Sequence, residues 1–371
     1  MPATLPGTED HPHARAVLTP ALPPEGTASH AYLFHGPAGS GKRDVARELA
    51  AVLLADGADD PADAAARVRS GAHPDLTWVA PSGAAEMLVS DIDEPVVAAA
   101  TRTPFEARRR VFVIERADTM NDQAANRMLK TLEEPPAFAH LILLTDRLGE
   151  VLPTIASRCQ LVRFDPLPPE AIAERLGRHG VPPETAAACA RLALGDGECA
   201  LALALGTGPA LRDAAERFAR AAMADDLTSR PWSALIAQAK AAGDQAAAEA
   251  EGRTAAELEY ASKRDRKRVE REGAERAKRA QRRAATAALD LGLQLTGLWL
   301  RDLAAIADGA PEVVHNVDRR DALATDAEGR DPHALRAGVD LVDDTRFRLQ
   351  LNVTDELALE ALAYRLAERL S

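Results

Sequence analysis

The stretch from Tyr32 to Arg43 constrains the fold of this chain most strongly. A short apolar run at residues 32–34 gives way to glycines and then to a helix-forming sequence. In loops of the pattern G-x-x-x-x-G-K-[ST], glycines let backbone N–H groups surround a phosphate, and the lysine meets the outer phosphates. Gly36, Gly39, Gly41 and Lys42 fit such a loop. The pattern predicts a strand, a phosphate loop and a helix, and the alternative is a glycine-rich turn with a lysine nearby.

Two positions depart from a working phosphate-loop enzyme. Arg43 stands where Ser or Thr would hold Mg²⁺, and a guanidinium cannot ligate a cation. The apolar run at residues 110–114 ends in Glu115 and Arg116, where such enzymes place carboxylates that meet Mg²⁺ and orient water. Glu115 can still reach a metal, but Arg116 cannot polarise water. We therefore expect a nucleotide pocket that hydrolyses poorly.

Composition narrows the class of protein. The chain has 371 residues, of which 46% are hydrophobic, enough for two or three domains. Its three cysteines, at positions 159, 189 and 199, have no metal-ligand spacing, so we expect no zinc site and a reducing compartment. Neither a signal peptide nor a membrane-length apolar run is evident, which predicts a soluble cytoplasmic protein. The net charge of -12 argues against a DNA-coating protein.

Apolar runs alternate with helical patterns through the first half of the chain. Strands are expected at residues 32–34, 76–79, 110–118, 141–145 and 161–164, with helices after the phosphate loop and at residues 121–134. This alternation predicts an α/β fold with a parallel sheet whose binding loops lie at the strand C-termini.

Two further motifs carry a resemblance to a family. Residues 126–136 read N-R-M-L-K-T-L-E-E-P-P, and residues 152–159 read L-P-T-I-A-S-R-C. Together with the phosphate loop, they resemble the clamp-loader subunits of bacterial DNA polymerase III, gamma/tau and delta-prime. The resemblance implies an AAA+ P-loop α/β domain at residues 1–165, a helical lid at 166–208 and a helical collar at 209–371 that includes a charged helical run at 249–285.

The departures fit the delta-prime branch of that family. The gamma/tau motor keeps Ser or Thr after the loop lysine and an Asp-Glu pair in place of Glu115 and Arg116, and many members carry four zinc-binding cysteines. Residues 50–78 contain no cysteine, and no sensor arginine stands near residues 195–201. The resemblance implies a stator that needs no cofactor or zinc, hydrolyses nothing itself and is compatible with weak ATP or ADP binding.

Partners follow from the same resemblance. The implied direct partners are gamma/tau and delta. Through the complex, the chain would also meet the sliding clamp and primer-template DNA, and no membrane is involved. The implied role is to help ATP-driven clamp loading during DNA replication. Two alternatives stay open, a gamma/tau-like ATPase and an AAA+ scaffold unconnected with replication. The S-R-C triplet implies that Arg158 is an arginine finger acting in trans on a neighbour's nucleotide. The alternative is that Arg158 pairs with a local carboxylate.

The second half of the chain holds a strongly basic run. Between residues 263 and 283 there are 11 Lys or Arg against 4 Asp or Glu. Charges spaced i to i+4, at 268/272, 271/275, 272/276 and 275/279, favour a solvated helix over a nucleic-acid contact, because no aromatic side chain is interleaved. Near the end, an apolar stripe at 359, 362, 363, 366 and 370 predicts a helix, and the resemblance places that helix in a collar where subunits pack.

Overall fold

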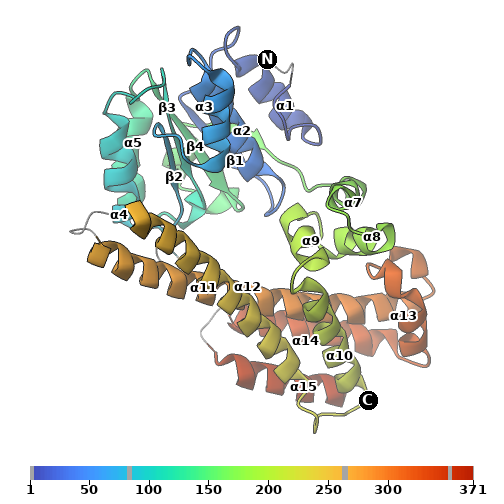
Figure 1. Ribbon diagram of the computed structural model, residues 1–371. Coiled ribbons are helices and arrows are strands. Elements are labelled where there is room, and N and C mark those ends of the chain that lie inside the picture. The colour runs from blue at the N-terminus through green and yellow to red at the C-terminus, as the bar shows by residue number, and fades with distance from the viewer. Residues whose placement is uncertain (1–3, 82–85, 261–265, 350–352, 371) are drawn as a thin grey trace. The chain divides into compact units, whose positions relative to one another are not determined.

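The computed structural model describes residues 4–81, 86–260, 266–349 and 353–370 (Figure 1). The chain divides into two compact units. The first comprises residues 1–171 with 195–197, and the second comprises residues 172–194 with 198–371.

The first unit is built on a parallel five-stranded sheet in the order β2-β3-β4-β1-β5 (Figure 1). The strands are β1 (Ala31–His35), β2 (Leu76–Val79), β3 (Arg110–Ile114), β4 (Ala139–Thr145) and β5 (Gln160–Arg163). Every residue of β3 and β4 is buried, as expected where helices cover both faces of a parallel sheet. The predicted α/β fold with a parallel sheet is confirmed.

Helices pack on both faces of this sheet. They are α1 (Pro12–Leu18), α2 (Lys42–Ala55), α3 (Pro61–Ser70), α4 (Val89–Ile92), α5 (Asp122–Glu133) and α6 (Pro153–Ala156), with single-turn or π-helical segments at Thr19–Ala21, Asp93–Ala98, Ala117–Thr119 and Leu148–Glu150. One apolar cluster joins α1 and α2 to the sheet, and another joins α4 and α5. The sequence pattern did not predict α3. It begins at Pro61, and the carboxylate of the preceding N-cap residue, Asp60, accepts hydrogen bonds from the N–H groups of Ala62 and Asp63.

The second unit is helical, as predicted. Its helices are α7 (Pro169–Arg178), most of which belongs to it, α8 (Pro183–Leu192), α9 (Gly197–Ala204), α10 (Gly208–Met223), α11 (Trp232–Tyr260), α12 (Arg266–Ala307), α13 (Arg320–Ala327), α14 (Pro332–Leu349) and α15 (Asp355–Leu370), with 3-10 turns at Pro311–Val313 and Val317–Arg319. Residues 266–283 of the basic run and the apolar residues that follow them form one helix, α12, and residues 263–265 of the run lie outside the described residues. The division into lid and collar domains stays a prediction. Among the described residues, no helix is long and apolar enough to span a membrane.

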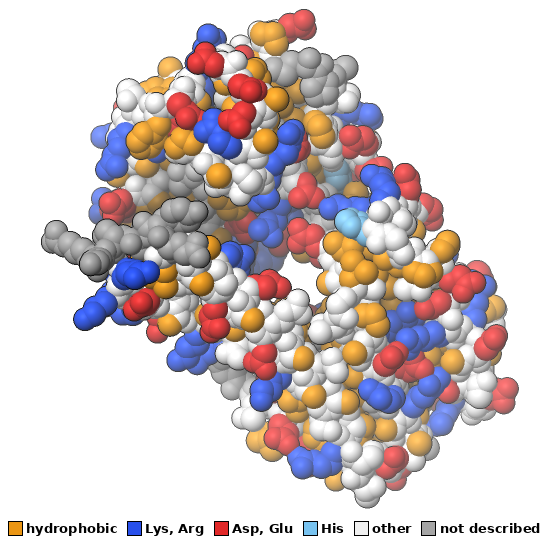
Figure 2. All heavy atoms as spheres, viewed as in Figure 1, with side chains coloured by type: hydrophobic (Ala, Val, Ile, Leu, Met, Phe, Trp, Pro, Cys, Tyr) orange, Lys and Arg blue, Asp and Glu red, His pale blue; other side chains and the backbone are white. Residues whose placement is uncertain are grey.

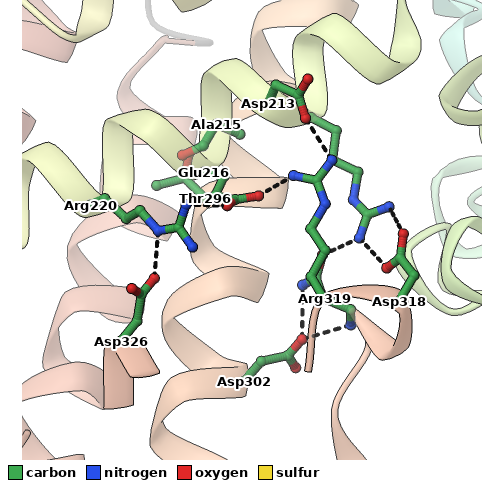
Figure 3. A network of polar contacts seen from close by, with 11 residues as sticks. Asp213, Ala215, Glu216, Arg220, Thr296, Asp302, Asp318, Arg319 and Asp326 are labelled. Carbon is green, nitrogen blue, oxygen red and sulfur yellow. Dashed lines mark hydrogen bonds and ion pairs between the residues drawn. The ribbon is translucent and has the colours of Figure 1, made fainter. Parts of the chain in front are cut away.

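A buried polar network fixes the segment before α13 against α10 and α12 (Figure 3). Arg212 of α10 donates to both carboxylate oxygens of Asp318, at 2.7 and 2.6 Å, and to Oδ1 of Asn316 at 2.8 Å. The fully buried Asp302 of α12 accepts from the backbone N–H groups of His315 and Asn316, at 3.0 and 2.8 Å. Each buried charge is therefore paired or hydrogen-bonded, which offsets the cost of removing it from water.

The apolar stripe of α15 belongs to the core of the second unit. Its five predicted members, Leu359, Leu362, Ala363, Leu366 and Leu370, are all buried. Leu366 and Leu370 lie against Gly338 of α14. The stripe is therefore covered within the chain itself, and an interface with another subunit would need the opposite face, where Leu357 is 63% exposed and Tyr364 is 56% exposed.

Candidate nucleotide-binding site

The phosphate loop joins β1, between β4 and β5 in the sheet, to the first turn of α2. Gly39 and Gly41 have φ of +66° and +82°, a backbone region that side chains other than glycine rarely adopt. At Gly36 an added Cβ would lie 2.2 Å from the carbonyl oxygen of Phe164. The predicted strand, loop and helix are all present, and the three glycines are needed for the path of the loop.

The lysine of the loop is occupied by groups of its own chain. The buried Nζ of Lys42 donates to the carbonyl oxygens of Gly36, at 3.0 Å, and Pro37, at 2.8 Å. It also lies 2.5 Å from Oδ1 of Asp146. An ammonium group has three N–H donors, so these contacts satisfy it. A nucleotide phosphate would have to displace Asp146 to reach Lys42.

Arg43 and Glu115 are brought together from opposite sides of the site. Nη2 of Arg43 lies 2.7 Å from Oε1 of Glu115, at the end of β3. The same oxygen accepts a hydrogen bond from Nε1 of Trp78 at 2.5 Å. In a phosphate-loop enzyme Mg²⁺ is held by the residue after the lysine and by the acid at this strand end. Here the guanidinium of Arg43 lies beside Glu115, where such an enzyme would hold Mg²⁺, so the negative charge of Glu115 is balanced within the chain.

Arg116 follows Glu115 in a left-handed conformation, with φ of 52°, and begins a 3-10 turn. The next acidic side chain in this turn, Asp118, is buried and accepts from Oγ1 of Thr145 at 2.8 Å. Its other oxygen lies 3.1 Å from Nη2 of Arg147. Arg116 therefore puts a cation at the position of the water-orienting acid, and the nearby carboxylate of Asp118 is already hydrogen-bonded.

A distant segment of the chain lies against the loop. The N–H of Gly197 donates to the carbonyl oxygen of Gly39 at 3.2 Å. A Cβ added to Gly39 would lie 1.7 Å from Oδ1 of Asp196, so that carboxylate is in contact with the loop. Asp146 and Asp196 thus add negative charge beside a loop whose backbone suits an anion. Neither carboxylate was identified from the sequence, although Asp146 directly follows β4, at the edge of the sheet where binding groups gather.

His11 closes the loop on another side. Its ring is buried and packs edge-on against Phe164, with ring centroids 4.9 Å apart. Burial lowers the pKa of His11, although a hydrogen bond with the backbone of Ser40 acts in the opposite direction. The imidazole is therefore neutral at pH 7 and adds no positive charge to the loop.

Arg158 lies at the end of α6, and its side chain is 36% exposed. Nη2 lies 2.5 Å from Oε1 of Glu133 at the end of α5, and Nη1 donates to the carbonyl oxygen of Thr154 at 2.9 Å. Among the described contacts, none joins Arg158 to residues 36–43. The local carboxylate considered as the alternative partner is therefore present, and the pair is exposed enough to open at small cost.

No cluster of three or more His, Cys, Asp or Glu side chains in the described part of the chain could hold a metal ion.

The first half of the chain is similar to a family of known proteins. The family described as DNA polymerase III, delta subunit, matches residues 14–168. The delta' subunit of DNA polymerase III from Bacillus subtilis is 38% identical over 164 residues, which are 43% of this chain and 49% of that protein. The tau subunit from the same organism is 33% identical over 156 residues, 40% of this chain and 27% of that protein.

A solved structure resembles more of the chain at lower identity. A gamma subunit-related protein of DNA polymerase III from Thermotoga maritima has a TM-score of 0.43 and 18% identity, and covers 92% of this chain and 94% of its own. By sequence, the chain spans about half the length of the delta' relative it matches.

Proposed function

We propose that the whole chain is the delta-prime stator of a bacterial clamp loader, because its first half matches the family described as DNA polymerase III, delta subunit, and is similar to the delta' subunit from Bacillus subtilis. It assembles with gamma/tau and delta in the cytoplasm and helps them load the sliding clamp onto primed DNA. The gamma/tau subunits supply the ATP hydrolysis. This chain requires no bound cofactor for its part.

The observation that supports a non-hydrolysing role is the pairing of Arg43 with Glu115. A motor subunit needs a hydroxyl and a carboxylate to hold Mg²⁺, and here a cation of the chain neutralises that carboxylate. The Lys42–Asp146 contact acts in the same direction, because it occupies the ammonium that would bind the outer phosphates. Both contacts disfavour the alternative of a gamma/tau-like ATPase.

Arg158 is the residue through which the chain would act on a neighbour. Its guanidinium is at the surface, its partner Glu133 is 48% exposed, and exposed pairs of this kind contribute about 0–1 kcal/mol. A neighbouring nucleotide phosphate can therefore compete for it. A planar guanidinium suits the charge of a transferring phosphate, so Arg158 would complete the ATP site of the adjacent motor subunit.

Assembly and hydrolysis test this proposal together. The chain is mixed with gamma/tau and delta, and the complex is isolated by size-exclusion chromatography and its composition determined by native mass spectrometry. We expect one stable complex that contains this chain. Arg158→Ala should leave assembly intact and lower DNA- and clamp-stimulated ATP hydrolysis partially, because only one of several sites is affected.

Glu133→Gln is the matched control for Arg158→Ala. It removes the local ion pair and keeps the guanidinium, so hydrolysis should stay at or above the unmodified rate. Failure of the chain to join gamma/tau and delta would instead favour a scaffold unconnected with replication. Unchanged hydrolysis by the assembled Arg158→Ala complex would show that Arg158 has a structural role and does not act on a neighbour's nucleotide.

A further inference from the structure

Helices α11 and α12 form a two-helix arm, defined here as residues 240–260 and 266–288 (Figure 1). The described residues that are buried within it are all small: Gly243, Ala250, Thr254, Gly273 and Ala277. A Cβ added to Gly273 would lie 2.2 Å from Cγ2 of Thr254, and one added to Gly243 would lie 2.9 Å from the carbonyl oxygen of Gln281. The two helices therefore touch almost backbone to backbone, and the larger polar side chains of the arm point to solvent.

One outer face of α12 carries a row of cations, which we call the basic stripe: Lys267, Arg271, Lys278 and Arg282. Spacings of four, seven and four residues place them on one side of a helix, opposite the face of Gly273 and Ala277. All four are exposed. At a rise of 1.5 Å per residue, the stripe is about 22 Å long. In Figure 2, basic and acidic side chains both lie along the outer part of the arm.

Of the stripe residues, Arg271 was the one for which the sequence pattern predicted an acidic partner, Glu275. Among the described residues, no ion pair joins Arg271 or Arg279 to Glu275, and the pair between Arg268 and Glu272 is long, at 3.8 Å. None of the four stripe residues has an ion-pair partner in the part of the chain that the structure describes. Residues 266–283 hold nine Lys or Arg against three Glu. The stripe thus lies in a segment with an excess of positive charge, in a chain whose net charge is -12.

We propose that the basic stripe binds the phosphate backbone of double-stranded nucleic acid, without sequence preference. A duplex carries one negative charge per about 1.7 Å of its axis, so a row about 22 Å long can meet several phosphates. Long, unpaired Lys and Arg side chains suit backbone contacts, which position a protein and do not read bases. This inference concerns direct contact by one arm and goes beyond the proposed function.

Two other polyanions fit the arm less well. Single strands are held largely by bases stacking on aromatic side chains, and no aromatic residue lies within residues 266–288. Surface helices that bind membranes also bury large apolar side chains in the lipid. Among the described residues of the arm, no large apolar side chain is exposed. The chemistry therefore favours a duplex backbone.

Fluorescence anisotropy with the full chain and a labelled 20-base-pair duplex tests the proposal between 50 and 200 mM salt. The test variant replaces Lys267, Arg271, Lys278 and Arg282 with Gln. Each neutralised phosphate contributes about 0.9 to the slope of log Kd against log salt, so the variant should lower the slope by about three to four. We expect affinity at 50 mM salt to fall at least about tenfold, because non-specific binding is mainly electrostatic.

A control variant removes the same charge outside the basic stripe: Arg217, Arg320 and Arg369, together with Lys240 at the base of the arm, all exposed, are replaced with Gln. It should bind as the unmodified chain does. Ala274→Lys provides a gain-of-function test that does not weaken the arm, since Ala274 is exposed between Arg271 and Lys278. It should steepen the slope by about one. Circular dichroism checks that each variant keeps its helix content.

Several results would overturn the assignment. One is equal binding by the test variant and the unmodified chain, or an equal loss in the control variant. Another is an unchanged slope in Ala274→Lys. If polyglutamate competes as well as the duplex, or a single strand binds as tightly, the arm attracts polyanions in general and the duplex is the wrong ligand. Because these assays use the chain alone, their failure leaves the assembly test of the proposed function unaffected.

Discussion

Replacing Asp146 with Asn should tighten the binding of ATP. In the folded chain, Oδ1 of Asp146 lies 2.5 Å from the Lys42 ammonium, so a triphosphate must break this contact and also approach a carboxylate of its own charge. The Asp146 side chain is 45% exposed, so solvent screens much of the interaction. A discounted value of about 1 kcal/mol is appropriate for such a pair, which corresponds to about fivefold in Kd.

The assay is fluorescence anisotropy of a labelled ATP analogue titrated with protein at fixed Mg²⁺. Asp93→Asn is the control, because Asp93 is similarly exposed, at 48%, and also faces a cation of its own chain, Arg127, at 3.7 Å. That control removes one negative charge without touching the loop, and its affinity should equal that of the unmodified chain. An Asp146→Asn protein that binds the analogue no better than the control would refute the view that this carboxylate blocks Lys42.

Three further predictions follow from the same contacts. The isolated chain should hydrolyse ATP no faster than its Lys42→Ala variant in a steady-state phosphate-release assay, and a rate near about 1 s⁻¹ that depends on Lys42 would contradict this. Leu362→Ala should lower the free energy of unfolding by about 2–5 kcal/mol in urea titrations, because the side chain is fully buried. Leu357→Ala, on the exposed face, should change the free energy of unfolding by less than about 0.5 kcal/mol and should instead weaken subunit assembly. Burial would raise the pKa of Asp302, but hydrogen bonds from His315 and Asn316 outweigh this effect and hold the pKa below its usual 3.8. The ionised carboxylate therefore stabilises the folded chain above pH 3.8, and this stabilisation is lost as the pH falls below that value. Asp302→Asn should flatten this acid dependence in thermal melts and lower the free energy of unfolding by about 1–3 kcal/mol at pH 7.

Local patterns predicted most of the first unit. The order of apolar runs and glycines indicated the parallel sheet and the phosphate loop, because strand burial and loop geometry depend on neighbours in the sequence. The helix α3 was missed, although Asp60 and Pro61 carry its start signal. Arg43 and Glu115 were each identified as departures, but their contact depends on how β1 and β3 are placed in the sheet.

Groups that come from far along the chain could not be predicted in this way. Asp196 reaches Gly39 across more than 150 residues, and no local pattern marks it. The stripe on α15 shows a related limit: periodicity predicted an apolar face, but which surface covers that face is a property of the tertiary packing. Glu133 and Arg158 lie in two separate motifs, and neither motif alone indicates that the two side chains form an ion pair.

Clamp loading by the reconstituted complex tests the central claim most directly. The rate at which a labelled sliding clamp is placed on primed DNA is measured with gamma/tau and delta alone, with the unmodified chain added, and with the Lys42→Ala variant added. The stator account predicts that loading requires the chain and proceeds at the same rate with Lys42→Ala, because in this account Lys42, which lies against Asp146, takes no part in hydrolysis. Loading that is unaffected by omission of the chain, or that is lost when an assembled complex carries Lys42→Ala, would contradict it.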